Sequence, residues 1–229
     1  MRILILGAGG HAQVIADAIL SAGRLGEEMK LVGFLDDDAD KVRQHLSGSR
    51  VLGTLVQVGE FEHDAVIAGI GDNGVRARVF DQMRRQGERF ARVIHPRATV
   101  AEDVELGDGT VVFAGAVINT GSVIGPDSII NTGATVDHHA RIGAHAHIAP
   151  GAHLGGGVSL GQGVMMGIGT SVIPGRSVGE WTVVGAGAVV IRDLEAHVTA
   201  VGVPARVVGC QSHGNPSVTQ GRATRQGPA

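Results

Sequence analysis

The chain has 229 residues and a formal net charge of −3, with 43% hydrophobic residues, 3% aromatic residues and 37 glycines, which indicates a globular protein with a core of small and branched aliphatic side chains. The charge argues against a nucleic-acid partner, and no apolar run reaches the roughly 18 residues needed to cross a membrane or forms a signal peptide. The single cysteine, Cys210, excludes an internal disulfide, so we expect a cytoplasmic protein.

The first half of the chain alternates between apolar strands and amphipathic helices. Residues 2–6 (RILIL) predict a buried strand, and after a glycine turn the helically spaced Val14, Ile15, Ala18 and Ile19 predict a helix. KLVGFLDDD and DAVIAGIGDN predict further buried strands, and VRARVFDQMRRQG predicts a second helix. This order predicts a small Rossmann-like α/β domain with a parallel sheet over residues 1–92.

The glycine turn suggests a phosphate-binding loop. Gly7, Gly9 and Ala12 fit a loose G-x-G-x-x-[GA] pattern between a strand and a helix, which is typical of dinucleotide binding. NAD is disfavoured because the domain is about half the size of a full dinucleotide fold, and because Asp36 and Asp37 lie almost thirty residues after Gly7 rather than ~20. The N–H groups at a helix N-terminus would equally bind the diphosphate of a nucleotide sugar.

The second half of the chain has a period of six residues. Every sixth residue from Ile94 to Val190 is aliphatic, and the fourth residue after each of these anchors is small except at Arg176. This hexapeptide repeat predicts a parallel β-helix with three short strands, or eighteen residues, in each coil, over residues 93–208. Residues 209–229 contain almost nothing apolar, which predicts a disordered tail.

Five of the eleven histidines crowd into sixteen residues of this repeat: His138, His139, His145, His147 and His153. Imidazoles can bind a metal, but convergence within one β-helix requires a separation near eighteen residues, and no two of these histidines have it. We therefore predict no metal site, although ligands could still meet across a subunit interface. The opposite interpretation is that these rings point outward and merely form part of the polar surface, most strongly so for His145 and His153.

Glycines are predicted one coil after three of the histidines. His138 faces Gly156, His139 faces Gly157 and His145 faces Gly163, which leaves space beside the rings and exposes main-chain N–H groups. An imidazole next to such a slot favours acyl transfer over metal binding, because a base needs a substrate path and an oxyanion needs hydrogen-bond donors.

Several stretches together resemble the PglD/NeuD-type bacterial sugar acyltransferases, over nearly all of the chain up to Val208. They are LGAGGHAQV at 6–14, FLDDD at 34–38, GIGDNGVR at 69–76, IHPRATV at 94–100, NTGATVDHH at 131–139 and GVPAR at 202–206. The resemblance implies a left-handed β-helix, a homotrimer with active sites between subunits, and acetyl-CoA as co-substrate. The resemblance implies no metal.

The resemblance also implies roles for individual residues. His138 corresponds to the general base, and Asn131 to a supporting asparagine. The neighbour of the base is usually an acid, but here it is His139, so either His139 holds the ring of His138 or an acid comes from elsewhere; Asp137 should point to the opposite side of the strand. The resemblance implies an acetyl contact for His147, a pantetheine track along Gly156, Ile168 and Ala186, and a nucleotide-sugar site comprising Gly9, Gly10, His11, Asp36, Asp37, Gly71 and Asn73.

These residues lead to three functional hypotheses. The first is an acetyl-CoA-dependent N-acetyltransferase that acts on the amino group of a nucleotide-linked amino sugar. The second is an O-acetyltransferase of a sialic-acid-like sugar, which needs the same base. The third is a non-enzymatic scaffold whose loop senses a nucleotide.

Overall fold

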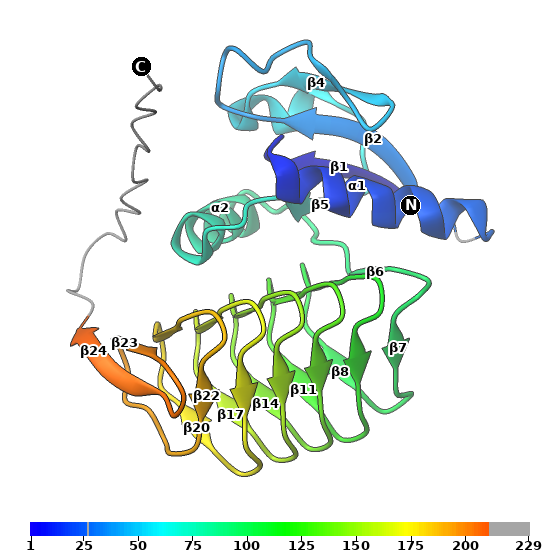
Figure 1. Ribbon diagram of the computed structural model, residues 1–229. Helices are drawn as coiled ribbons and strands as arrows, with labels where there is room; N and C mark the ends of the chain where they lie inside the picture. Colours follow the sequence, from blue (N-terminus) through cyan, green and yellow to red (C-terminus); the bar gives the residue numbers. More distant parts are fainter. Residues whose placement is uncertain (27, 211–229) are drawn as a thin grey trace, which may run out of the picture.

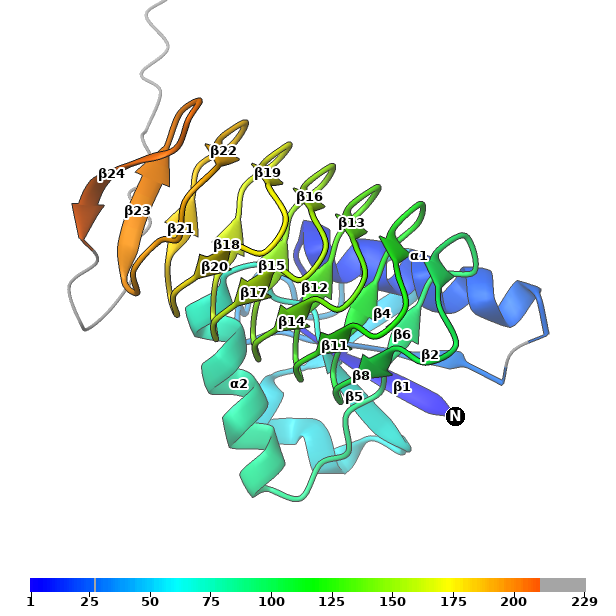
Figure 2. The ribbon, with the colours of Figure 1, turned by 90° about the horizontal axis from the view of Figure 1, so that it is seen from below.

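The chain forms two domains, as seen in a computed structural model that describes residues 1–26 and 28–210. The α/β domain covers one face of the β-helix, and the two views of the ribbon agree on this arrangement (Figure 1, Figure 2). The final strand runs to Cys210, two residues beyond the predicted end of the β-helix domain. The remainder of the predicted tail, 211–229, lies outside the described residues.

The α/β domain has the predicted parallel sheet with helices on both faces, in the strand order β3-β4-β2-β1-β5, where only β3 is antiparallel to its neighbour. Its elements are β1 (Arg2–Leu6), α1 (Gly10–Arg24), β2 (Lys30–Leu35), β3 (His45–Leu46), β4 (Ser49–Gly53), the 3₁₀ helix η1 (Leu55–Glu60), β5 (Ala65–Ala68) and α2 (Asn73–Arg85).

The central strand β1 is apolar throughout because both of its faces are covered. Ile3 and Ile5 pack in one cluster with α1, whereas Leu4 and Leu6 pack in another with α2 and η1. On α1, three of the four predicted apolar positions are buried, but Val14 is exposed.

The second half is a left-handed parallel β-helix, as predicted. Each hexapeptide contributes one two-residue strand, and each coil contains three. The strands are β6 (Val93–Ile94), β7 (Thr99–Val100), β8 (Glu105–Leu106), β9 (Val111–Val112), β10 (Val117–Ile118), β11 (Val123–Ile124), β12 (Ile129–Ile130), β13 (Thr135–Val136), β14 (Arg141–Ile142), β15 (His147–Ile148), β16 (His153–Leu154), β17 (Ser159–Leu160), β18 (Met165–Met166), β19 (Ser171–Val172), β20 (Ser177–Val178), β21 (Val183–Val184) and β22 (Val189–Val190), followed by β23 (Val198–Val201) and β24 (Arg206–Cys210).

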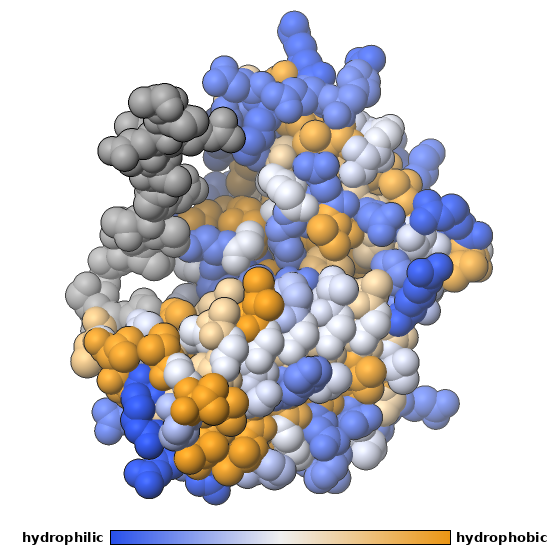
Figure 3. Space-filling model, in the orientation of Figure 1, coloured by the Kyte–Doolittle hydropathy of each residue, from blue (hydrophilic) through white to orange (hydrophobic). Residues whose placement is uncertain are grey.

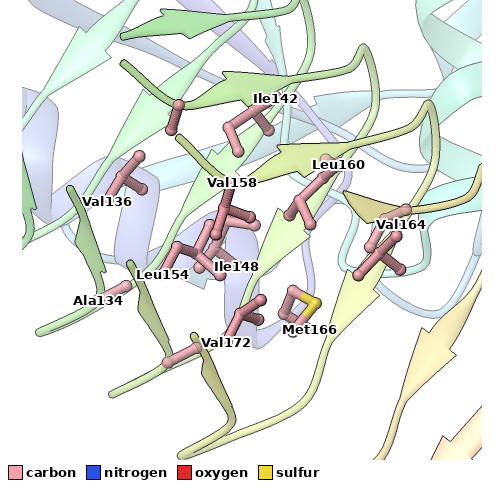
Figure 4. Close-up of a cluster of buried hydrophobic side chains, with 14 of the residues drawn as sticks. Ala134, Val136, Ile142, Ile148, Leu154, Val158, Leu160, Val164, Met166 and Val172 are labelled. Carbon is pink, nitrogen blue, oxygen red and sulfur yellow. The ribbon is translucent and has the colours of Figure 1, made fainter. Parts of the chain in front are cut away.

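The coils stack with a register of eighteen residues, so that Val117 pairs with Thr135, and Thr135 with His153. The second residue of each strand is the aliphatic anchor. From Ile118 onward these anchors are buried and meet on the axis of the prism, together with the small residues of the turns (Figure 4). The period of six thus produces the core that the sequence predicts.

The prism has three sheets and three edges. The domain-facing sheet contains β6, β9, β12, β15, β18, β21, β23 and β24, and the other two are the β7–β22 sheet and the β8–β20 sheet. Following the chain, the first edge consists of the turns after the domain-facing sheet, such as 131–134. The second edge consists of the turns after the β7–β22 sheet, such as 137–140, and the third edge returns to the domain-facing sheet through turns such as 143–146.

The two domains share a core. Outward-facing residues of the domain-facing sheet, Val93, Val111 and Ile129, pack in one cluster with Ile15 and Ile19 of α1. Because this contact is extensive and apolar, it fixes the glycine loop of the α/β domain relative to the β-helix.

Candidate active site

His138 lies on the second edge, between β13 and β14, with its ring exposed to solvent. The Cε1 and Nε2 atoms of the ring lie over Gly156, one coil further on, where a Cβ would come within 2.6 Å of both atoms. The predicted pairing of His138 with Gly156 is therefore confirmed. Only glycine leaves room for the ring at this position.

His139 holds the other side of the base. The Nδ1 atoms of His138 and His139 lie 3.0 Å apart, with the two rings nearly perpendicular, so one nitrogen donates a hydrogen bond to the other. The prediction that His139 faces Gly157 is wrong. Its backbone has a φ of 60°, in the left-handed region, and its ring lies instead over Gly121, one coil earlier.

Asp137 does not supply the acid for the base. Its Oδ1 atom accepts hydrogen bonds from the main-chain N–H of His138 and from Asn119 Nδ2, both at 2.8 Å. Its carboxylate thus stabilises the turn, and the ring of His139 is the hydrogen-bond partner of the His138 ring.

Asn131 and His147 form a second group, away from His138. Asn131 lies on the first edge, and its Nδ2 is 3.0 Å from His147 Nε2 in β15 of the domain-facing sheet. Strand β13 separates Asn131 from His138. Of the three residues predicted for catalysis, His138 and His139 are therefore in contact, whereas Asn131 lies apart from them within one chain.

The glycine loop of the α/β domain reaches this second group. His11, at the start of α1, has its ring centroid 6.1 Å from that of His147 and packs edge-on against Phe113. The pKa of His11 is lowered to about 4 and that of His147 to about 3, mainly by burial and to a smaller extent by the nearby Arg76 guanidinium. Both rings are therefore neutral near pH 7. His11 Nε2 and His147 Nδ1 are buried without a hydrogen-bond partner.

One pocket of the α/β domain collects most of the predicted substrate residues, with the glycine loop on one side and the ends of β2 and β5 on the other. Asp36 Oδ2 accepts a hydrogen bond from Ala8 N (2.7 Å) and forms an ion pair with Lys41 Nζ (3.1 Å). Its carboxylate thus holds the glycine loop in place. Lys41 is a pocket residue that the sequence analysis missed, although a lysine five residues after an acidic strand end was a usable signal. The predicted residues that line the pocket are Gly9, Gly10, His11, Asp36, Asp37 and Gly71.

Asn73 does not line this pocket. Its Nδ2 donates to the carbonyl oxygens of Gly163 and Val164 on the third edge, at 3.1 and 3.2 Å. Asn73 therefore ties α2 to the β-helix.

The sequence analysis also missed Arg76, which is 1% exposed and joins the two domains. Its guanidinium makes an ion pair with Asp127 Oδ2 at 3.2 Å and donates to the carbonyl oxygen of His145 at 2.7 Å. Asp127 Oδ2 also binds His145 Nδ1 at 2.7 Å, one coil away. The interpretation of His145 as a polar surface residue is wrong, because its ring is buried in this network.

The residues predicted for the pantetheine track lie on two different edges of the prism. Ile168 and Ala186 stack one above the other on the first edge, like Asn131, and are exposed, whereas Gly156 lies with His138 on the second edge. Further exposed apolar residues gather on the last coils and on β24, where Figure 3 shows an apolar surface; they include Ile173, Ile191, Val203, Val207 and Val208.

Comparisons with known proteins agree with this architecture. Residues 2–83 match the PglD N-terminal domain, and residues 121–156 match the bacterial transferase hexapeptide (six repeats). The structure is similar to that of a mutant of perosamine N-acetyltransferase from Caulobacter crescentus in complex with CoA and GDP-perosamine. The TM-score is 0.84 at 39% identity, over 91% of this chain and 97% of that one. The chain belongs to the PglD family of bacterial sugar acyltransferases.

Two further PglD-type relatives support the assignment. The acetyltransferase domain of PglB from Neisseria gonorrhoeae, in complex with acetyl coenzyme A, matches with a TM-score of 0.84 and 34% identity, over 90% of this chain and 98% of that one. UDP-N-acetylbacillosamine N-acetyltransferase from Bacillus subtilis is 36% identical over 118 residues, which are 49% of this chain and 51% of that protein. This match thus spans about half the length of the curated relative.

Within this PglD-family chain, residues 1–26 and 28–210 contain no group of three or more His, Cys, Asp or Glu side chains arranged to hold a metal ion. In the same part of the chain, no helix combines the length and apolar character that a membrane span requires.

Proposed function

We propose that the protein is an acetyl-CoA-dependent N-acetyltransferase that acts on the amino group of a nucleotide-linked amino sugar. The observation that carries this proposal is the His138 ring over Gly156, on a β-helix whose domain-facing sheet adjoins a glycine-loop pocket. The names of the relatives support the acceptor, since they act on perosamine and bacillosamine sugars.

His138 acts as the general base in this proposal. The amino nitrogen of the sugar attacks the thioester carbon, and His138 Nε2 takes a proton from that nitrogen. The C–S bond then breaks, the acetyl group stays on nitrogen as an amide, and CoA leaves as a thiol after protonation. For Nε2 to accept, the hydrogen between the two Nδ1 atoms must reside on His138, so His139 Nδ1 is the acceptor.

Gly156 supports the oxyanion of the tetrahedral intermediate. Its N–H donates to no main-chain or side-chain acceptor in the described part of the chain, and it lies beside the ring of the base. A main-chain N–H in this position can stabilise the developing negative charge without moving.

The active site is proposed to lie between subunits of a homotrimer. His138 and Gly156 occupy the second edge of the prism, whereas Asn131, Ile168 and Ala186 occupy the first edge, and His147 lies in the domain-facing sheet. If the first edge of one copy faces the second edge of its neighbour, the residues of both edges would come together in one active site.

The pocket of the α/β domain is proposed to hold the nucleotide diphosphate. The N-terminal N–H groups of α1 at Gly10 and His11 favour a phosphate, and Lys41 adds a cation to the pocket. A cytoplasmic location remains a prediction.

A screen of UDP-, GDP- and dTDP-linked amino sugars with acetyl-CoA, read as thiol release, tests the proposal. Each amino sugar is paired with the analogue that carries a hydroxyl group at the same carbon. Turnover of an amine but not of its hydroxyl analogue supports N-acetylation. The reverse result supports the O-acetyltransferase alternative.

The scaffold hypothesis predicts a different result. An enzyme of this kind binds acetyl-CoA and is stabilised by it, so a thermal melt should shift upward with increasing acetyl-CoA concentration. A melting temperature unchanged by acetyl-CoA, together with no thiol release from any acceptor, would reject the enzymatic proposal.

A further inference from the structure

The second edge of the prism contains an acid that neither the family resemblance nor the mechanism above uses. Asp103 lies in the turn after β7, two coils before His138, and its Oδ2 accepts hydrogen bonds from Thr120 Oγ1 (2.7 Å) and Gly121 N (3.0 Å). The ring of His139 rests on the same glycine, where a Cβ at Gly121 would be 3.1 Å from His139 Nε2. Asp103 and the ring of His139 therefore both contact Gly121.

The backbone determines this arrangement. The left-handed φ of His139 turns its side chain toward the preceding coil, while His139 N donates to Thr120 O at 2.9 Å. The ring of His139 is thus held between the base on one side and the turn that binds Asp103 on the other. The carboxylate of Asp103, the imidazoles of His139 and His138, and Gly156 thus follow one another along the second edge.

We propose that Asp103 is a positioning residue that acts on the base through His139: its negative charge compensates the positive charge that the His138–His139 pair carries while His138 holds the proton taken from the substrate. This proposal rests on the acyl transfer proposed above. It assigns the acid that usually neighbours the base to a residue two coils before His139 rather than to the next position in the chain.

The charges around the pair support this role. Hydrogen bonds from Thr120 and Gly121 lower the pKa of Asp103, and the charge of His139 lowers it further, so Asp103 is ionised at neutral pH. Asp137 is the other carboxylate that faces the pair. Its pKa is lowered by hydrogen bonds from Asn119 and the main chain of His138, and by the charge of the His138 ring. The carboxylate of Asp137 thus bonds to the main chain of the turn beside His138, whereas that of Asp103 lies at the turn on which the His139 ring rests.

The reaction proposed here needs the base neutral, so activity falls when the pair becomes protonated at low pH. In general, a nearby carboxylate stabilises a protonated imidazole. Removing the charge of Asp103 should therefore shift the acidic limb of the kcat/KM profile to lower pH, by about 0.5 pH unit for a solvent-exposed group.

Asp103→Asn tests this inference, because the amide oxygen can still accept from Thr120 and Gly121. The matched control is Asp193→Asn. Asp193 lies on the same edge and accepts a hydrogen bond from Ser177 N at 3.0 Å, but it is three coils, about 14 Å, from His139. We expect the acidic limb to move for Asp103→Asn only. An equal shift in both variants, or none in Asp103→Asn, would overturn the proposal.

The double variant Asp103→Asn/His139→Asn shows whether Asp103 acts through His139. Asn is the L-residue best tolerated at a left-handed φ, so the turn should persist. We expect the double variant to show no larger shift than His139→Asn alone, whereas additive shifts would mean that Asp103 acts on His138 directly.

The imidazole titrations of His138 and His139, followed by NMR without substrate, separate this inference from the proposed function. The titration midpoints should move in Asp103→Asn even if no acceptor sugar is ever turned over. Unmoved midpoints in an active enzyme would reject the role of Asp103 and leave the acetyltransferase proposal intact.

Discussion

His138 and Gly156 occupy consecutive coils of the second edge, and the imidazole of His138 fills the space that a side chain at 156 would need. Gly156→Ala should therefore displace the ring while leaving the fold intact, because the ring is exposed and free to move. We expect kcat to fall by about 10- to 100-fold, since a misplacement near 1 Å can cost that much. The melting temperature should be unchanged.

Gly59→Ala is the matched control for this substitution, because a Cβ at Gly59 meets nothing within 4 Å. Normal kcat in Gly156→Ala would show that the position of the His138 ring over Gly156 does not matter for turnover.

His138→Ala should lower kcat by ~10²- to 10⁴-fold, the usual contribution of a positioned base, with little change in stability because the side chain is exposed. The measurement is steady-state thiol release with the acceptor found in the screen. His153→Ala serves as the control, since this exposed ring on the β7–β22 sheet hydrogen-bonds to Thr135 and lies away from His138. Wild-type turnover in His138→Ala would remove His138 as the base.

The sequence predicts features that depend on the local repeat, and misses features that depend on how the α/β domain packs against the β-helix. The anchors from Ile94 to Val190 predict the prism, and the register of eighteen places Gly156 beside His138, because both follow from a regular period. The period alone does not show which neighbouring coil His139 faces: a left-handed φ recurs at every sixth residue from 109 to 187, and at His139 it directs the side chain to the preceding coil.

The network of Arg76, Asp127 and His145 requires the α/β domain to be docked on the β-helix, and no sequence period connects α2 to the third edge. Asp127 lies eighteen residues before His145, so the period does predict this pair once carboxylates are considered as partners of the histidines. Asn73 was placed in the substrate site because its contact with the β-helix appears only after docking.

Asp127→Asn should destabilise the protein by about 3–5 kcal/mol, because it leaves the buried guanidinium of Arg76 without a counter-charge. Asn tolerates the left-handed φ of 56° at this position, so the loss would report the charge rather than the backbone. The measurement is the free energy of unfolding in urea. Asp108→Asn removes exposed ion pairs to Arg84 and Arg92 and should cost less than about 1 kcal/mol.

Equal effects of Asp127→Asn and Asp108→Asn would contradict the idea that the buried ion pair holds the two domains together.

The stability of the protein should fall between about pH 6.5 and about pH 3. Burial lowers the pKa values of His11 and His147 below that of an unfolded imidazole, so the unfolded chain takes up protons first as the pH falls. The contribution of the two neutral rings is present above pH 6.5 and is lost as the pH decreases. We expect a loss of about 1–2 kcal/mol for each ring between pH 7 and pH 5.

Urea unfolding at the two pH values measures this loss. His147→Gln should reduce the pH dependence, whereas His153→Gln, at an exposed position, should leave it unchanged. A pH dependence in His147→Gln as steep as in the wild type would contradict the prediction.

Mixed assemblies test whether the active site is shared between subunits. His138→Ala removes a residue of the second edge, and Ile168→Asp places a charge on the first edge, where the acyl-CoA track is proposed. Each variant alone should be inactive. We assume that one site takes its second edge from one subunit and its first edge from the neighbour. In random trimers, roughly a quarter of the interfaces then have two intact edges. Co-expression of the two variants should therefore restore roughly a quarter of wild-type activity. Light scattering should give the mass of a trimer for all three preparations. No recovery in mixed trimers would mean that both edges of a site come from the same chain, and a monomer mass would reject the shared site altogether.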